Sequence, residues 1–417
     1  MQVREERLKD DLLANGSFGA VDVETGRGRT VLTGSEADER ARTRLVETLE
    51  SNGMDVRIDP VGNVAGRWTP PSADPDADPV AAGSHLDSVP EGGIFDGPLG
   101  VYAAVEAVRA IRDAGYEPKR PIDVVSFTEE EGGRFGVGLL GSSVAGGHRT
   151  VEEALELEDD GDTLGELLAE IGFHGSATIA PEQWTAWLEL HIEQGTVLER
   201  EGLPVGIVNA ITGITNCRVE IRGEADHAGS TLMNERTDAL VAAAEFVERT
   251  DEIAREITAT DSEFVAATVG ELDVSPGARN IVPGRVALSM DVRDVDRSVM
   301  DDVVTQAQRR LARLETDRGV DTELDRYRTQ DAVEMSDRCM DALAAASDRY
   351  GVDRLQLPSG GGHDTMNLAH ATDVGLLFAR SRDGMSHSPR EWTDWEDCAT
   401  AAQVLAGALV ELTDADR

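Results

Sequence analysis

An alternation of short apolar segments with helix-length stretches constrains the fold more than any other feature of the chain. Apolar strand-like segments occupy 79–84, 121–127 and 185–191. Helix-like stretches with a C-terminal glycine occupy 36–52 and 98–114. Strands separated by helices of this length pair into sheets with parallel members. We therefore predict an α/β domain with a mixed, mainly parallel sheet.

The pattern changes near Thr212 and returns after residue 329. Apolar and polar residues alternate, as in half-exposed strands, at 216–222, 264–272 and 285–293. Helical patterns cover 234–259 and 297–315, and the later part adds a helix at 332–350, a strand at 374–379 and a helix at 391–413. We predict a discontinuous first domain, residues 1–211 and 329–417, interrupted by a smaller α+β domain at 212–328.

The charge is strongly acidic, with a formal net value of −41 from 39 basic and 80 acidic residues. Such a chain repels a phosphate backbone, which excludes nucleic acid as a partner. The acidic residues are spread along the whole chain, and Lys9 and Lys119 are its only lysines. A surface of this kind stays hydrated where salt screens the repulsion, with a Debye length of roughly 3 Å at 1 M. Our hypothesis is a halophilic protein from a high-salt cytoplasm.

Nothing in the sequence indicates a membrane. No run approaches the roughly 20 apolar residues that a spanning helix needs. The first residues, MQVREERLKDDLLANG, are charged and lack the apolar centre of a signal peptide, so a cytoplasmic location is expected. Three widely spaced cysteines form neither a zinc pattern nor a disulfide framework, and we expect buried thiols at Cys217, Cys339 and Cys398.

Five residues are candidate metal ligands, and they occur in the order His85, Asp96, Glu131, His191 and His387. Imidazole and carboxylate donors without cysteine suit zinc, or manganese, cobalt or nickel, in an open catalytic site. A lone histidine is more often a hydrogen-bonded core residue, but the Gly, Ser and Asp neighbours of His85 offer little core. Functional groups of parallel sheets gather beyond the strand C-termini, where His85, Glu131 and His191 fall.

Local spacing limits how the first ligands meet. His85 and Asp96 are eleven positions apart, so they cannot share one helical face. They converge if a strand ends at His85 and the chain returns through a turn at Gly97. Asp87 is then placed to orient the imidazole of His85.

Three consecutive glutamates, residues 129–131, follow the buried-strand pattern VVSF. A run of acids is usually a solvated helix start, but here one glutamate can bind metal while its neighbour acts as general base. Such a base accepts a proton from water and delivers it to a leaving amine. The residues alone do not show which of the three glutamates takes which role.

Five motifs carry a resemblance to a known family. They are GSHLDSVPEGGIFDGPLGV from residue 83, FTEEEGGRFG from 127, LELHIEQG from 188, LPSGGGHDTMNLA from 357 and SRDGMSHSPREW from 381. Together they resemble the amidase/hydantoinase/carbamoylase branch of the M20 metallohydrolases, in order from about residue 30 to 413. This branch includes N-carbamoyl-L-amino-acid hydrolases, allantoate amidohydrolases and β-ureidopropionases. The motifs HIEQG and SHSP separate it from the peptidases of the wider family.

The resemblance implies a role for each matching residue. Two divalent ions per subunit, zinc first and otherwise manganese, cobalt or nickel, would be held by His85, Asp96 and His191 and by Asp96, Glu131 and His387, with Asp96 bridging. Glu130 would be the general base, with Asp87 and His227 also in the catalytic set. Substrate contacts would come from Gln194, His227, Asn280, Arg293, Gly360 and Gly361. Arg293 would hold the α-carboxylate, and the inserted domain would be a lid and homodimer interface.

The implied reaction is hydrolysis of the carbamoyl C–N bond of N-carbamoyl-L-amino acids, which releases the amino acid, carbon dioxide and ammonia. The alternatives are allantoate amidohydrolase or β-ureidopropionase, whose substrates are also ureido acids, and an M20 dipeptidase. A catalytically inactive metal-binding protein is the alternative from another class. The presence of Glu130 and of all five candidate ligands argues against it.

Overall fold

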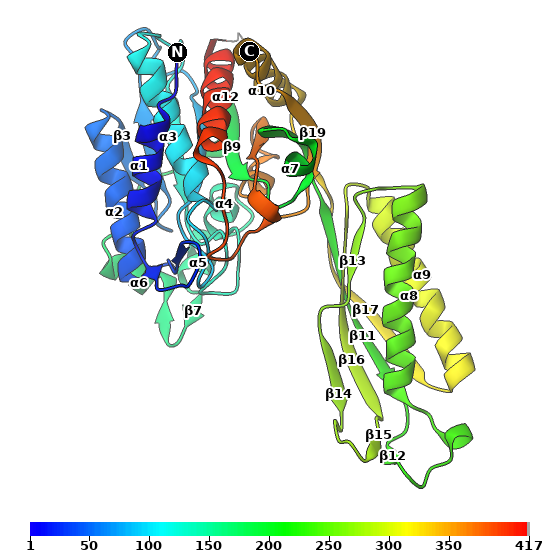
Figure 1. Cartoon of the computed structure of the whole chain (residues 1–417). Coiled ribbons are helices and arrows are strands. Elements are labelled where there is room, and N and C mark those ends of the chain that lie inside the picture. The colour runs from blue at the N-terminus through cyan, green and yellow to red at the C-terminus, as the bar shows by residue number, and fades with distance from the viewer. Residues whose placement is uncertain (415–417) are drawn as a thin grey trace. The chain divides into compact units, whose positions relative to one another are not determined.

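The computed structural model describes residues 1–414, which form two compact units. Unit 1 comprises Met1–Asn209 and the residues from Glu334 onward, and unit 2 is Ala210–Val333. Figure 1 shows the elements of both, coloured along the chain.

Unit 1 is built on a nine-stranded sheet. Its strands are β3 (Asp55–Ile58), β4 (Val64–Trp68), β5 (Val80–His85), β6 (Ile122–Phe127), β9 (Ala186–Ile192), β10 (Val205–Ile211), β18 (Val333–Glu334), β19 (Arg354–Ser359) and β20 (Val374–Ala379). Two small ribbons are β1 (Ala20–Val21) with β2 (Gly28–Arg29), and β7 (Glu158–Asp159) with β8 (Asp162–Thr163). The helices are α1 (Glu5–Asn15), α2 (Glu36–Ser51), α3 (Pro98–Asp113), α4 (Leu140–Ala145), α5 (Val151–Leu155), α6 (Leu164–Glu170), α7 (Val197–Glu201), α10 (Asp337–Tyr350), α11 (Thr365–Leu368) and α12 (Trp395–Asp414), with 3-10 turns at η1 (Pro181–Gln183) and η3 (Arg382–Gly384).

The sheet is mixed, and its four central strands, in the order β20-β9-β5-β6, pair in parallel. The pairs β10–β20, β4–β6 and β3–β4 are antiparallel. The expectation of a mixed sheet is confirmed, with parallel pairs at its centre. A tight turn explains the β3–β4 hairpin, because Asp59 accepts hydrogen bonds from the backbone of Val61 and Asn63.

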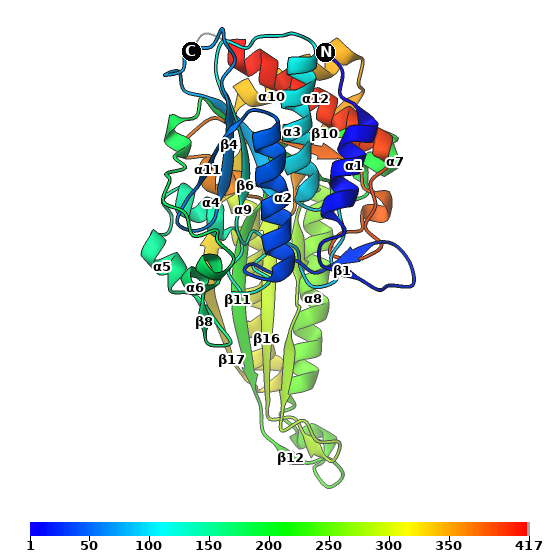
Figure 2. The same cartoon turned by 90° about the vertical axis from the view of Figure 1, so that its left-hand side faces the viewer.

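The central strands form the core of unit 1. All residues of β5, β6, β9 and β20 are buried, as expected for parallel strands covered on both faces. Helix α3 packs on β5 and β9, and α12 packs on α3, α10 and β20. Figure 2 shows α1, α2 and α3 covering the near side of this sheet. The C-terminal ends of β5, β6 and β9 thus lie side by side on a rigid support.

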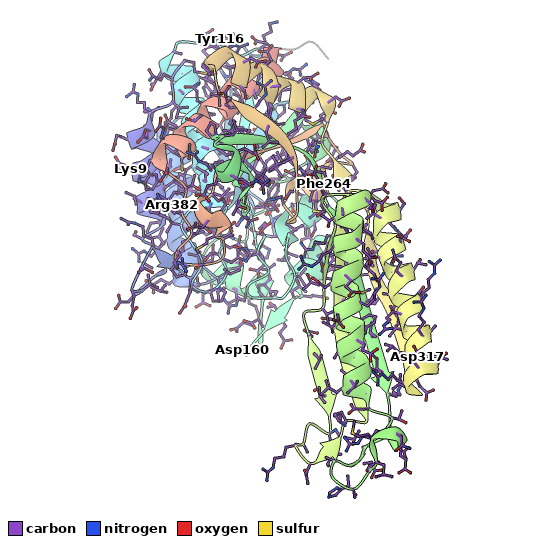
Figure 3. All side chains as sticks on the ribbon, turned by 45° about the vertical axis from the view of Figure 1, so that its right-hand side comes forward. Lys9, Tyr116, Asp160, Phe264, Asp317 and Arg382 are labelled. Atoms are coloured by element: carbon purple, nitrogen blue, oxygen red, sulfur yellow. The ribbon has the colours of Figure 1, made fainter. Side chains whose placement is uncertain are left out.

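Unit 2 is an α+β structure. Its strands are β11 (Gly213–Arg222), β13 (Ala266–Thr268), β14 (Leu272–Ser275), β16 (Arg285–Asp294) and β17 (Asp321–Gln330), with a ribbon of β12 (Asp226–His227) and β15 (Ile281–Val282). Its helices are α8 (Ala239–Thr260) and α9 (Arg297–Arg318), preceded by η2 (Met233–Glu235). All strand pairs of the larger sheet are antiparallel. Helices α8 and α9 lie side by side along the sheet, with Asp317 near the end of α9 and Phe264 just beyond α8 (Figure 3).

Several predicted boundaries were wrong. Helix α8 begins at Ala239 rather than 234, because the Asp238 carboxylate caps it by accepting from the backbone of Leu240 and Val241. Helices α10 and α12 also begin four or five residues later than the patterns indicated. The segment 264–272 is not one strand, since β13 ends at Thr268 and β14 begins at Leu272.

Within residues 1–414, no helix combines the length and apolar character needed to cross a membrane. Cys217, Cys339 and Cys398 are buried and unpaired, which confirms the expected thiols.

Candidate metal centre and active site

Three adjacent parallel strands bring the first site residues together. His85 is the last residue of β5, and His191 is next to last in β9. Strand β5 lies between β6 and β9, so the chain leaving β6 toward the glutamates emerges beside His85. The rings of His85 and His191 are stacked with their centroids 5.9 Å apart. Both are almost fully buried.

Asp96 reaches these rings through the turn that precedes α3. Its Oδ1 lies 3.0 Å from His191 Nε2 and 3.6 Å from His85 Nε2. The turn depends on Gly97, whose φ is +80° and whose added Cβ would lie 2.5 Å from the His85 ring. Only glycine permits both this backbone conformation and this close approach. His85, Asp96 and His191 offer ligand atoms that all lie within 4.8 Å of one another.

A second group shares Asp96. Its Oδ2 lies 3.5 Å from His387 Nε2, and Glu131 Oε2 lies 3.1 Å from the same nitrogen. Asp96, Glu131 and His387 also place ligand atoms within 4.8 Å of one another. His387 lies between η3 and α12 in a left-handed conformation, with φ of 54°, and its side chain is 51% exposed. The structure therefore brings all five candidate ligands into two groups joined at Asp96.

The three glutamates point in different directions. Glu129 has a φ of 55°, and its Oε1 accepts hydrogen bonds from the backbone of Arg134 and Phe135, so it stabilises the following turn. Glu130 Oε2 lies 3.6 Å from His85 Nε2. Glu131 belongs to the second ligand group. Glu130 is thus left beside the ligands with its carboxylate available.

Asp87 connects His85 with the segment that carries the glutamates. Its Oδ1 lies 3.5 Å from His85 Nδ1, and its carboxylate accepts hydrogen bonds from the backbone of Glu130 at 3.2 Å and Glu131 at 3.0 Å. One buried carboxylate therefore orients the imidazole and fixes the backbone of the glutamates. This is the position that the sequence predicted relative to His85.

The electrostatics suit cation binding and proton transfer. Burial opposes ionisation of Asp96, but His191 and His85 hold the pKa of this carboxyl well below its ordinary value. Burial raises the pKa of Glu130 well above that of an ordinary glutamate, toward the range in which a general base works best. The hydrogen bond to Glu131 raises the pKa of His387 to about 9.

The donor set fits divalent cations. His85 Nε2 is buried and has no hydrogen-bond partner among the described residues, although carboxylate oxygens of Asp96 and Glu130 each lie 3.6 Å from it. Buried polar atoms without a partner are rare, and a nitrogen kept for a metal ion explains this one. Asp96 adds a buried carboxylate, and Glu131 adds one whose side chain is 5% exposed. His387 completes a set of nitrogen and oxygen donors typical of catalytic zinc sites.

Gln194 and the glycine-rich turn adjoin this centre. Gln194 Nε2 donates to Asp96 Oδ2 at 3.0 Å and to Ser386 Oγ at 2.8 Å. An added Cβ on Gly361 would lie 3.3 Å from Gln194 Oε1, so this glycine also borders the centre. Gly360 precedes it, directly after β19.

The remaining predicted residues belong to unit 2. His227 lies in β12, exposed, and its Nδ1 accepts hydrogen bonds from the backbone of Gly229 and Ser230. Asn280 is close by, since the backbone of Ala228 donates to its carbonyl oxygen. Arg293 lies in β16, where its Nε donates to Asp291 Oδ1 at 3.0 Å. Unit 2 thus brings His227 and Asn280 together on its small ribbon, while Arg293 lies on its larger sheet.

Comparison with known proteins agrees with the family resemblance of the sequence motifs. The sequence model of peptidase family M20/M25/M40 matches residues 81–411. The chain belongs to this family. An N-carbamoyl-L-amino acid amidohydrolase of Geobacillus stearothermophilus is 38% identical over 99% of this chain and 100% of its own. A ureidoglycolate hydrolase of Oryza sativa subsp. japonica is 33% identical over 91% of this chain and 79% of its own. The crystal structure of an amidase of the hydantoinase/carbamoylase family from Burkholderia multivorans superposes with a TM-score of 0.93 at 34% identity, covering 100% and 99% of the two chains.

These relatives confirm the branch of the family that the motifs indicated.

The sequence did not reveal several residues that the structure places around the centre. Ser386 donates to Asp96 Oδ2 at 2.7 Å, and Glu189, buried in β9, accepts from Ser84 and from Thr365. Both residues lie in motifs quoted above: Ser386 is adjacent to His387, and Glu189 is two positions before His191. That spacing was the signal that could have identified them. Arg29, whose guanidinium donates to the carbonyls of Gly93 and Asp96, had no such signal.

Proposed function

We propose that this protein is a metal-dependent amidohydrolase that cleaves the carbamoyl C–N bond of N-carbamoyl-L-amino acids, releasing the amino acid, carbon dioxide and ammonia. One observation carries the proposal: two ligand groups share Asp96, and Glu130, whose side chain is 10% exposed, lies beside them. The relatives confirm the predicted class, a hydrolase of non-peptide C–N bonds.

Two divalent ions per subunit, with zinc as the first choice and manganese, cobalt or nickel as alternatives, would be held by the two groups. His85, Asp96 and His191 would hold one, and Asp96, Glu131 and His387 the other. Bound at this position, the ions would supply Lewis-acid polarisation of the substrate carbonyl and a lowered pKa of water.

Glu130 is proposed to move the proton. Its raised pKa suits it to accept a proton at a carboxylate oxygen from the attacking water and then to give it to the leaving nitrogen. Asp87 fixes the Glu130 backbone and the His85 ring, which keeps this oxygen beside the ligands.

Substrate recognition is proposed from residues of both units. Gln194, Gly360 and Gly361 in unit 1 and His227, Asn280 and Arg293 in unit 2 would contact the substrate. The planar guanidinium of Arg293 is suited to a substrate carboxylate, and His227 with Asn280 would polarise the scissile carbonyl. We further propose that residues 212–328 serve as a lid and as the interface of a homodimer.

The test is ammonia release from four ureido acids: N-carbamoyl-L-methionine, allantoate, N-carbamoyl-β-alanine and ureidoglycolate. The protein is first chelated, and zinc, manganese, cobalt or nickel is then added back. The proposal expects N-carbamoyl-L-methionine to be the best substrate and chelation to remove activity. Release from allantoate or N-carbamoyl-β-alanine alone would reassign the enzyme to that substrate. Peptide cleavage without ammonia would indicate a dipeptidase.

A high-salt cytoplasm is the proposed setting. The support is the charge of −41 spread along the chain together with the scarcity of lysine.

A further inference from the structure

Two buried charged side chains from distant parts of the chain hold the loop that carries Asp96. We call residues 86–96 the Asp96 loop. Arg29 lies in β2 and is 0% exposed, and Glu391 lies just before α12 and is 1% exposed. Neither belongs to the two ligand groups. The hydrogen bonds that join them to the Asp96 loop go to its backbone.

Glu391 fixes the end of the loop. Its Oε1 accepts hydrogen bonds from the backbone N–H of Phe95 at 2.9 Å and of Asp96 at 3.0 Å. Glu391 follows His387 by four residues, so one segment supplies both a candidate ligand and the support of the shared carboxylate. The contact is tight, because an added Cβ on Gly93 would lie 2.1 Å from Glu391 Oε1.

Arg29 fixes the same loop at both ends. Its Nε donates to the carbonyl of Gly93 at 2.9 Å, and Nη1 donates to that of Leu86 at 3.0 Å. Its Nη2 donates to the carbonyls of Asp87 at 3.2 Å and Asp96 at 3.4 Å. A planar guanidinium in the centre of the loop thus determines the distance between its first and last residues.

We propose that Glu391, together with Arg29, is a positioning residue for the shared carboxylate Asp96, an inference that rests on the dimetal function proposed above. The two oxygens of Asp96 face different ligand groups, so a small rotation of its backbone would misplace both at once. Groups that orient ligands in this way typically change metal affinity by roughly 10- to 100-fold when they are removed.

The first experiment compares Glu391→Ala with Glu391→Gln. Chelated full-length protein is titrated with zinc by calorimetry, and kcat and KM for N-carbamoyl-L-methionine are measured at saturating zinc. The alanine variant should bind zinc roughly 10- to 100-fold more weakly and lose kcat, with KM little changed. The glutamine variant keeps a carbonyl oxygen for the two N–H groups and should restore both values. A glutamine variant as impaired as the alanine variant would overturn the hydrogen-bond basis of the proposal.

A second pair of variants leaves Glu391 in place. Gly93→Ala inserts a methyl group where Glu391 Oε1 lies and should reproduce the loss of zinc affinity. Gly92→Ala is the matched control, because the nearest neighbours of its Cβ would be Val89, at 3.1 Å from both Cγ2 and the carbonyl oxygen, and Ser88 Cβ at 3.4 Å, rather than Glu391. The control should bind zinc like the wild type.

A buried carboxylate elsewhere separates positioning from general stability. Glu106 is 0% exposed and accepts a hydrogen bond from the backbone of Arg4. Glu106→Ala should lower the melting temperature of the chelated protein and leave zinc affinity unchanged.

The outcomes distinguish the two proposals. If the wild type takes up no zinc, the dimetal function itself fails. If the wild type takes up two zinc ions and both Glu391→Ala and Gly93→Ala bind them equally well, the positioning role is overturned and the dimetal function stands. If Glu391→Ala does not fold, the comparison of Gly93→Ala with Gly92→Ala decides.

Discussion

Replacing Glu130 by glutamine tests the proposed proton transfer most directly. The substitution keeps the size of the side chain and one carbonyl oxygen but removes the ability to accept a proton. The backbone should stay in place, because the Glu130 N–H is held by Asp87 Oδ1 at 3.2 Å, independently of the Glu130 carboxylate. Any loss of rate therefore reports on the chemistry of the carboxylate.

The expected loss is large. General acid–base catalysis contributes typically about 10²- to 10⁴-fold, or about 2.7 to 5.5 kcal/mol of activation free energy. We expect the upper part of this range, because the same carboxylate serves both the attack of water and the departure of the amine.

Metal uptake should survive the substitution. Burial lowers the pKa of His85, whereas the charges of Glu130 and Asp87 raise it, and the net shift is upward. Removal of the Glu130 charge therefore favours the neutral imidazole, which is the form that binds metal. The assay is ammonia release at saturating substrate, with zinc content measured on the same samples.

The neighbouring substitution Glu129→Gln is the control. Glu129 is also buried, but its Oε1 accepts from the backbone of Arg134 and Phe135, and a glutamine oxygen can accept the same bonds. This variant should turn over within a few-fold of the wild type. A Glu130→Gln protein with full zinc content and a rate close to that of wild type would refute the assignment of Glu130 as the base.

Three further predictions concern the residues of the site, and a fourth concerns the charge of the chain. His387→Ala should reduce bound zinc from two ions to one and abolish most activity, measured by metal analysis after dialysis; two retained ions would contradict the second ligand group. Arg293→Ala should raise KM for carboxylate substrates with kcat little changed. An unchanged KM would show that Arg293 does not bind the substrate carboxylate. In chelated protein, the pKa of His387 is raised to about 9, so its protonated form should contribute stability that is fully present below about pH 6.5 and is lost as pH rises through about 9. Melting scans should show this trend in the wild type and not in His387→Ala. The melting temperature should be higher in about 3 M than in about 0.1 M potassium chloride, and equal values would remove the high-salt hypothesis.

The sequence predicted the parts of the centre that depend on strand ends. His85 and His191 terminate buried apolar runs, and parallel strands bring such ends to one edge, so their proximity followed from general rules. Gly97 was expected to make the turn that returns Asp96. The roles of residues 129–131 could not be read in the same way. The left-handed conformation of Glu129 turns its side chain toward the next turn, and nothing in three identical residues marks that conformation.

Contacts between distant segments were beyond the sequence. Arg29 and Glu391 are separated by most of the chain, yet both hold the Asp96 loop. Arg29 lies in a short glycine-rich segment that carries no periodic pattern. Pattern analysis identifies residues that repeat with a helix or strand, and a single buried side chain that serves a loop leaves no such repeat.

The acidity of the chain and the proposed substrate class conflict at low salt. A ureido acid carries a negative carboxylate, and a protein with a net charge of −41 repels it over a long range. The field attracts divalent cations in the same conditions, so dilute salt favours loading of the metal centre but opposes arrival of the substrate. At about 1 M salt the Debye length falls to roughly 3 Å, and only contacts as close as a guanidinium on a carboxylate remain effective. A high-salt setting therefore removes the repulsion while leaving short-range recognition by a residue such as Arg293 intact, which makes the surface charge and the proposed chemistry compatible.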